Sequence, residues 1–174
     1  VVVDDLGQHS GGAHLLRVID WCALQNEGLP VRFAALLHDL GKGLTAREDW
    51  PDHAGHEARG MDPVRQVSER LRVPNECREL ALCVARWHGD AHRADRTDAA
   101  GLLQLLERTD AFRRPERLDG FLRACAADFH GRPGWEERPY PQAGRLRAAL
   151  RAAQSVDAGA VARRAPPGEI AQAI

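Results

Sequence analysis

The residues best suited to chemistry are His38 and Asp39, which stand side by side where an apolar stretch ends. Residues 30–37 begin with proline and are almost wholly apolar, so they predict a buried helix that Gly41 and Gly43 end. A buried carboxylate without a partner costs on the order of several kcal/mol. A divalent metal ion binds both a neutral imidazole and a carboxylate, so the pair predicts a metal site.

Two residues on other expected helices complete a ligand set of nitrogen and oxygen atoms. His14 precedes Val18 by four residues, so it flanks the apolar stripe of the first expected helix. Asp110 follows Leu106 by four residues, so it is expected on an apolar stripe and facing the interior. Two imidazoles and two carboxylates suit a borderline or hard divalent ion such as Mn, Fe, Co, Ni, Zn or Mg.

The remaining histidines divide into candidates for the site and surface residues. His53 and His56 are three residues apart near the start of a helix, where they could bind a second metal ion or a phosphate oxygen. His88, at the end of another expected helix, is a third candidate for the same role. The alternative for all three is an ordinary structural histidine. His9, His92 and His130 are expected at the surface.

Cationic side chains near the pair suit a phosphate substrate. Lys42 is the only lysine among 24 basic residues and follows the pair in a glycine loop. Its ammonium could neutralise a phosphate in the transition state, or be solvated. Two clusters of arginine follow later in the chain: Arg113, Arg114 and Arg117, and then Arg145, Arg147 and Arg151. Each cluster could be a solvated helix face or could contact phosphate or tRNA. Trp50 is expected to pack on the core rather than to stack on a base.

The elements that must position these side chains are predicted to be helices. Alanine, leucine and arginine dominate, and no stretch alternates over strand length, so we expect an all-α bundle of about seven helices around the metal site. The expected helices cover about 12–27, 30–40, 54–72 and 74–89, one capped by Thr97 or Asp98, one from Pro115 to Gly131, and 142–155.

Composition excludes several classes of protein. The 174 residues have a net charge of −1, so any nucleic-acid footprint would be a local patch. No apolar run is long enough for a membrane span, and because no charged segment followed by an apolar stretch opens the sequence, we expect no signal peptide. The four cysteines, which form no CxxC pair, predict reduced core thiols in a cytosolic protein.

The order His, His-Asp, Asp on successive helices resembles the HD phosphohydrolase superfamily, and the run HDLGKG at 38–43 strengthens the likeness. Within it, the chain from about 14 to 153 resembles the HD tail domain of bacterial multifunctional CCA-adding tRNA nucleotidyltransferases. The segments that carry this resemblance are RFAALLHDLGKG, HAGHE, ERLRVPNECRELAL, DAFRRPER and GRPGWEERPYPQAGRLRAAL.

The resemblance implies a metal-dependent phosphohydrolase that acts as a 2′,3′-cyclic phosphodiesterase, 2′-nucleotidase and phosphatase on the tRNA 3′ end or on small phosphate esters, in the cytoplasm. It implies Ni, Mg, Mn or Co as cofactor. The implied metal ligands are His14, His38, Asp39 and Asp110. We expect the catalytic residues to be His38, Asp39 and Lys42.

The resemblance also sets the domain organisation that we expect. Residues 1–155 would be the HD domain, and 156–174 the shortened start of the family's next helical segment. No glycine-rich strand turn precedes an Asp-x-Asp pair, so the chain is expected to be a fragment that does not add nucleotides. Two alternatives stay open, an HD nucleotide hydrolase and a non-catalytic tRNA-binding tail. The oligomeric state is also open, a homodimer included.

Overall fold

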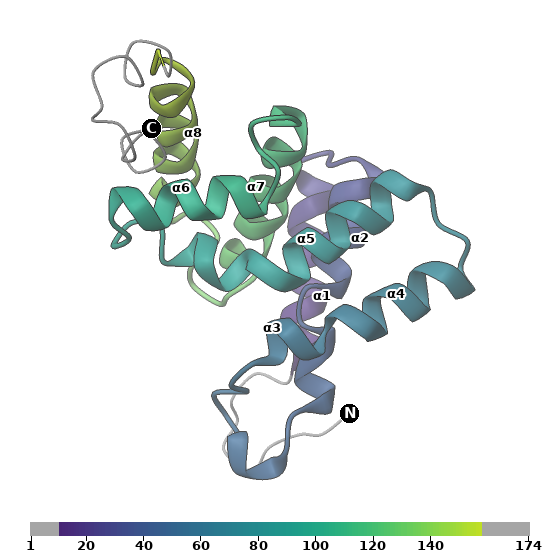
Figure 1. Ribbon diagram of the computed structural model, residues 1–174. Helices are drawn as coiled ribbons and strands as arrows, with labels where there is room; N and C mark the ends of the chain where they lie inside the picture. The colour runs from purple at the N-terminus through teal and green to yellow at the C-terminus, as the bar shows by residue number, and fades with distance from the viewer. Residues whose placement is uncertain (1–10, 158–174) are drawn as a thin grey trace.

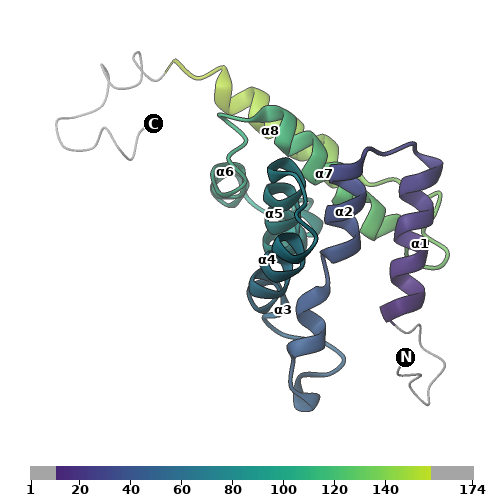
Figure 2. The ribbon, with the colours of Figure 1, turned by 90° about the vertical axis from the view of Figure 1, so that its right-hand side faces the viewer.

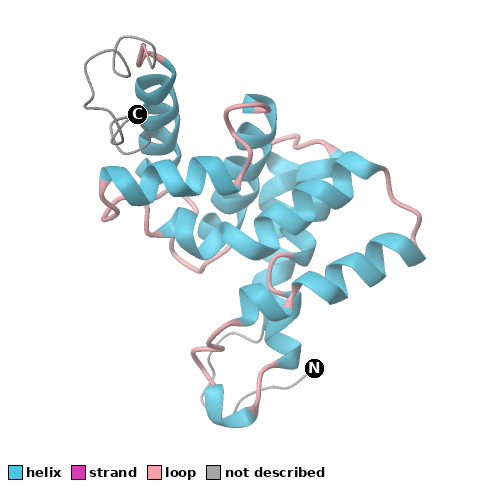
Figure 3. Ribbon diagram, viewed as in Figure 1, coloured by secondary structure: helices cyan, strands magenta, loops and turns pink. Residues whose placement is uncertain are grey.

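In the computed structural model, residues 11–157 are described, and they contain helices and no β-strand (Figures 1 and 3). The expectation of an all-α fold is confirmed. The main helices are α1 (Gly11–Leu24), α2 (Leu29–Leu37), α4 (Met61–Arg70), α5 (Asn75–His92), α6 (Ala99–Arg108), α7 (Pro115–His130) and α8 (Pro141–Gln154). None of the described helices has the length and apolarity that crossing a membrane requires.

Helix α2 is the central element that the apolar stretch predicts. It packs against α1, α5 and α7, and Figure 2 shows it between α1 and α5. Val31, Phe33 and Leu37 are buried in these contacts. Burial of each such side chain is worth about 1.5–3 kcal/mol. His38 directly follows Leu37, the last residue of this buried helix. It therefore lies inside the bundle, with only 2% of its surface exposed.

The single helix expected over 54–72 is divided into α3 (His56–Arg59) and α4, with Gly60 between them. The cause is a close crossing by η1 (Leu40–Leu44), a 3-10 helix that follows α2. A Cβ atom added to Gly41 would lie 2.0 Å from the carbonyl oxygen of His56. Only glycine fits there, and the crossing holds α3 beside the end of α2.

Other boundaries differ by a few residues, and the reasons are local. Helix α5 continues through Gly89 to His92, because a single glycine weakens a packed helix without ending it. A second 3-10 turn, η2 (Arg47–Asp49), interrupts the expected loop over 44–52. Asp98 caps α6 as expected, since its side chain accepts the N–H of Gly101 at 2.9 Å.

The cysteines are free thiols within the described residues, as expected. Cys22, Cys77 and Cys125 are buried and Cys83 is partly buried. Burial raises the pKa of Cys22 to about 11 and of Cys83 to about 12, so both are protonated at neutral pH. His9 and nearly all of the segment 156–174 lie outside the described residues, and the domain division at 155 stays a prediction.

Candidate metal centre

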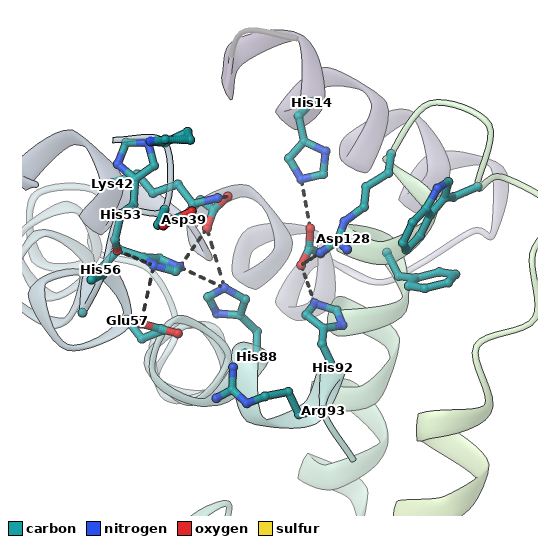
Figure 4. Close-up of a pocket in the computed structure, with 18 of the residues that line it drawn as sticks. His14, Asp39, Lys42, His53, His56, Glu57, His88, His92, Arg93 and Asp128 are labelled. Atoms are coloured by element: carbon teal, nitrogen blue, oxygen red, sulfur yellow. Dashed lines mark hydrogen bonds and ion pairs between the residues drawn. The ribbon is translucent and has the colours of Figure 1, made fainter. Parts of the chain in front are cut away.

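Histidines and carboxylates from five elements meet in one cleft of about 1100 Å³ (Figure 4). In Figure 4, Lys42 and His56 lie on one side of the cleft and His14 and Asp128 on the other. Asp39, which follows the end of α2, lies between the two sides. The side chains form two neighbouring groups that join at the adjacent residues His38 and Asp39.

The first group consists of His14, His38 and Asp128. The Nε2 atom of His14 lies 2.9 Å from Oδ1 of Asp128, and Nε2 of His38 lies 3.5 Å from the same oxygen. Asp128 and His38 are buried, and His14 is partly buried. One ligand atom from each residue lies within 4.8 Å of the others, which is the spacing of a site that could hold one ion.

The second group consists of Asp39, His56 and His88. Oδ1 of Asp39 lies 3.3 Å from Nε2 of His56 and 3.6 Å from Nε2 of His88, and the two Nε2 atoms are 3.3 Å apart. Ligand atoms about 2.1 Å from one ion, at tetrahedral angles, are about 3.4 Å apart. The triangle of donor atoms therefore has the dimensions of one face of a metal coordination shell.

The backbone orients these imidazoles through their other ring nitrogen. Nδ1 of His38 lies 2.8 Å from the carbonyl oxygen of Ala35, and Nδ1 of His88 lies 3.0 Å from that of Val84. Nδ1 of His56 makes the same contact within its own turn, at 3.0 Å. An Nδ1–H donated to a carbonyl leaves Nε2 with a lone pair, which is the usual arrangement of a metal-binding histidine.

Buried polar atoms without partners also fit a cation. Nε2 of His38 and Oδ1 of Asp39 are both buried and make no hydrogen bond to any of the residues 11–157. Such atoms are costly unless an ion or a proton satisfies them. The four imidazoles and two carboxylates of the two groups suit a borderline or hard divalent ion such as Mn, Fe, Co, Ni, Zn or Mg. The residues present therefore fit a divalent metal ion.

Charges in the cleft are strongly coupled. Burial disfavours the charged form of His38, yet Asp39 and Asp128 outweigh it and raise the pKa of His38 well above its usual value. Burial likewise opposes ionisation of Asp128, but His38 and neighbouring imidazoles hold its pKa well below the usual range. Burial, followed by the charge of His38, lowers the pKa of His88 to about 4. Without a metal ion the carboxylates are therefore ionised, His88 is neutral and His38 carries a proton, which a bound metal ion would displace from Nε2.

His92 belongs to the site, although the sequence predicts it at the surface. Its Nε2 lies 2.5 Å from Oδ2 of Asp128, and its Nδ1 lies 3.1 Å from the hydroxyl of Tyr140. Because α5 continues past Gly89, His92 stands one turn after His88 and faces the cleft. It holds the second oxygen of Asp128 and so orients the carboxylate.

The structure does not bring Asp110 to this site, so its expected position needs correction. Asp110 follows the end of α6 with φ of 58°, so the phase of the helix no longer applies to it. Its carboxylate accepts two hydrogen bonds from Arg113, at 2.8 and 3.0 Å. It does not line the cleft. Asp128 takes the position expected for it, and the signal was available, because Asp128 follows Ala124 by four residues on the buried stripe of α7.

Other predicted residues lie at various distances from the two groups. Nζ of Lys42 lies 2.6 Å from Oδ2 of Asp39, at the edge of the cleft. His53 lines the cleft but belongs to neither group, and its Nδ1 lies 2.5 Å from the hydroxyl of Thr45. Trp50 also lines the cleft and is 46% exposed, so the expectation that it packs on the core is wrong.

The arginine clusters lie away from the cleft. Arg114 and Arg117 pair with Glu79, and Arg113 pairs with Asp110. None of the residues of the two clusters lines the cleft; they are Arg113, Arg114, Arg117, Arg145, Arg147 and Arg151. His130, expected at the surface, is partly buried and stacks on Trp21 with ring centres 5.0 Å apart.

Comparison with known proteins places this chain in a family. The model of the HD domain matches residues 11–112, so the chain belongs to the HD-domain family. The chain is also similar to proteins named multifunctional CCA protein: 58% identical over 152 residues in Nitrosospira multiformis, 57% over 152 in Burkholderia multivorans, and 54% over 165 in Ralstonia nicotianae.

These similarities cover only part of each relative. The matches take in 87% of this chain for the first two relatives and 94% for the third, but 37%, 37% and 38% of the relatives themselves. The chain therefore corresponds to less than two-fifths of their length, and the resemblance to the HD tail of CCA-adding proteins is confirmed. No solved structure was found to match the chain.

Proposed function

We propose that this chain is a metal-dependent hydrolase of phosphate esters, acting as a 2′,3′-cyclic phosphodiesterase, 2′-nucleotidase and phosphatase on RNA ends and small nucleotides. The observation that carries the proposal is the meeting of two His and Asp groups in one open cleft, joined at His38 and Asp39. The similarity to multifunctional CCA proteins supports the tRNA 3′ end as a substrate. The same proposal includes a cytoplasmic location and tRNA as a partner.

The proposal assigns six ligands. His14, His38 and Asp128 would hold one ion, and Asp39, His56 and His88 a second ion or a phosphate oxygen. Divalent ions bound there would polarise a phosphoryl oxygen and lower the pKa of a water molecule from 15.7 toward about 7. We propose Ni, Mg, Mn or Co as the ion.

The chain's own residues would orient the reactants. His92 fixes Asp128 through its second oxygen, and the carbonyls of Ala35 and Val84 fix the rings of His38 and His88. Lys42 lies beside Asp39 with 40% of its side chain exposed, so its ammonium could turn toward a phosphoryl oxygen. Because Asp39 is a proposed metal ligand, a phosphate bound at the metal site would lie close to Lys42. The ammonium of Lys42 would then stabilise the negative charge that the phosphate gains in the transition state.

Two measurements test this function together. The chain is purified, loaded in turn with Ni, Mg, Mn or Co, and assayed for hydrolysis of 2′,3′-cyclic AMP, with its metal content read by elemental analysis. Asp39→Ala should abolish hydrolysis and lower the metal content while keeping the helical signal in circular dichroism. Full activity in Asp39→Ala would exclude hydrolysis at this site.

A second candidate function is a tRNA-binding module in which the metal site is structural. It is favoured by arginines on exposed helix faces, such as Arg145 and Arg151 on α8. Binding of tRNA to such faces should survive Asp39→Ala, whereas hydrolysis should not. This second function would be favoured if the wild type shows no hydrolysis and Asp39→Ala binds tRNA as tightly as the wild type does.

A further inference from the structure

A tight turn after α7 brings an arginine and a tryptophan together at the wall of the cleft. The turn reads Arg132-Pro133-Gly134-Trp135, and the backbone N–H of Trp135 donates to the carbonyl of Arg132 at 3.0 Å. Gly134 has φ of 75°. Proline followed by a glycine with positive φ is the pattern of a type II turn, which brings its first and fourth residues close together. The sequence itself therefore sets Arg132 beside Trp135.

The start of this turn is fixed against the bundle. A Cβ atom added to Gly131 would lie 2.5 Å from Cγ2 of Val18, so glycine is required for the contact with α1. The carbonyl of Gly131 also lies 3.3 Å from Nδ1 of His14, one of the proposed ligands. The residue that follows, Arg132, is therefore anchored next to the proposed ligand His14.

The guanidinium of Arg132 lies between the tryptophan and the ligands. Its central carbon is 5.1 Å from the centre of the Trp135 ring, within the range of a cation–π contact. Its Nη2 is 3.7 Å from Oδ2 of Asp128, beyond hydrogen-bond distance. Its side chain is 40% exposed and lines the cleft. Within the described residues the guanidinium makes no hydrogen bond, so its donors are available to a ligand.

The other cations that line the cleft are engaged or remote. Nζ of Lys42 lies 2.6 Å from Asp39, and Nη2 of Arg93 lies 2.6 Å from Asp90. Arg96 has a side chain that is 82% exposed and, within the described part of the chain, pairs only with its neighbour Asp95, at 3.8 Å. Arg132 lies close to a proposed metal ligand and has hydrogen-bond donors that are not used. Lys42, Arg93 and Arg96 each lack at least one of these two properties.

We propose that Arg132 binds the phosphoryl group of the substrate and that Trp135 is the positioning residue that holds its guanidinium in place. This inference rests on the proposed function and names its phosphate-binding residue. A planar guanidinium can give two parallel N–H donors to two phosphate oxygens. A phosphoryl group beside Asp128 would replace the loose 3.7 Å contact of Arg132 with two close ones. The ligand class is a phosphate monoester or cyclic phosphodiester.

Arg138 supplies a matched control. Its guanidinium carbon is 5.0 Å from the centre of the same Trp135 ring, but its side chain does not line the cleft. Arg138→Ala removes a similar charge and a similar ring contact without touching the proposed phosphate position. Any general effect of charge or of turn stability should appear in Arg138→Ala as well as in Arg132→Ala.

The test measures the affinity of the metal-loaded chain for inorganic phosphate by calorimetry, and KM and kcat for 2′,3′-cyclic AMP. Loss of hydrogen bonds to a charged group predicts that Arg132→Ala weakens phosphate binding and raises KM by roughly 10- to 100-fold. Its metal content should equal that of the wild type. Arg132→Lys should recover only part of the affinity, because an ammonium lacks the planar fork.

The role of Trp135 is tested by conservative replacement. Trp135→Ala should weaken phosphate binding in the same direction but less than Arg132→Ala, and Trp135→Phe should restore most of it, since a phenyl ring also attracts a guanidinium. A role in folding alone would lower the melting temperature without separating phenylalanine from alanine in phosphate affinity.

The outcomes separate this inference from the proposed function. If Arg132→Ala binds phosphate like Arg138→Ala and the wild type, while Asp39→Ala abolishes hydrolysis, the role of Arg132 is wrong and the function stands. If the wild type hydrolyses nothing but binds phosphate in a way that requires Arg132, the function fails and the phosphate site stands. Absence of phosphate binding by the metal-loaded wild type overturns the inference.

Discussion

His56 and His88 face each other through their Nε2 atoms, 3.3 Å apart, while the Nδ1 atom of each ring lies 3.0 Å from a backbone carbonyl oxygen. If each Nδ1 carries its proton, two lone pairs point at one another. A cation between them removes the repulsion, and Oδ1 of Asp39 lies where it would supply the third ligand.

This relationship predicts a second bound ion. The wild type should bind two divalent ions per chain, and His88→Ala should bind one, because the group of His14, His38 and Asp128 is left intact. Elemental analysis after dialysis gives the stoichiometry. If the wild type binds a single ion and His88→Ala binds the same number, the prediction is wrong and the second group would bind a phosphate oxygen instead.

Metal should stabilise the folded chain. The ligands come from separate elements that only folding brings together, so the unfolded chain has no equivalent site. At a free metal concentration of 100 times Kd, the folded state gains about 2.7 kcal/mol for each ion bound, which raises Tm by about 5–11 °C per ion for a chain of this size. Differential scanning calorimetry with and without chelator measures the shift. A shift that persists at full size in Asp128→Asn would contradict the ligand assignment.

Gly41 should be irreplaceable, whereas Gly43 should tolerate alanine. A Cβ atom at Gly41 would lie 2.0 Å from the carbonyl oxygen of His56 and 2.6 Å from the backbone nitrogen of Gly60, but one at Gly43 meets nothing within 4 Å. Gly41→Ala should lower the free energy of unfolding by on the order of 1–3 kcal/mol or more. Gly43→Ala should change it by no more than about 1 kcal/mol. Urea unfolding of both variants tests this, and equal stability would contradict the close crossing.

Lys42 should affect the rate rather than metal binding. If its ammonium reaches a phosphoryl oxygen, Lys42→Ala should lower kcat by on the order of 10²–10³, with metal content unchanged. Lys42→Arg should restore only part of the rate, because the planar guanidinium of arginine does not replace the compact charge of an ammonium. As the only lysine, it can also be modified selectively. A kcat within about twofold of the wild type would mean that Lys42 takes no part in the reaction and serves only as the ion-pair partner of Asp39.

The sequence was sufficient for the centre of the fold. The apolar stretch 30–37 predicts a buried helix, and burial of that helix puts His38 and Asp39 inside the protein. Both inferences use only helix periodicity and the cost of burying polar atoms, which act locally. The all-α expectation rests on helix propensity and on the lack of alternation over strand length, which are also local, and it is confirmed within the described residues.

Phase along a helix was insufficient where the helix ends. Asp110 and Asp128 each follow an apolar residue by four positions, so the sequence does not separate them. Only Asp128 lies inside its helix, whereas Asp110 lies beyond the end of α6 with a left-handed backbone. His92 was missed for a related reason, since Gly89 suggested a helix end that tertiary packing overrides.

The most direct test of the central claim compares Asp128→Asn with Asp110→Asn in hydrolysis of 2′,3′-cyclic AMP by the metal-loaded chain. Both changes remove one carboxylate charge and keep the side-chain shape. The account predicts that Asp128→Asn loses nearly all activity and binds less metal, whereas Asp110→Asn keeps both. Loss of activity in Asp110→Asn beside full activity in Asp128→Asn would contradict it.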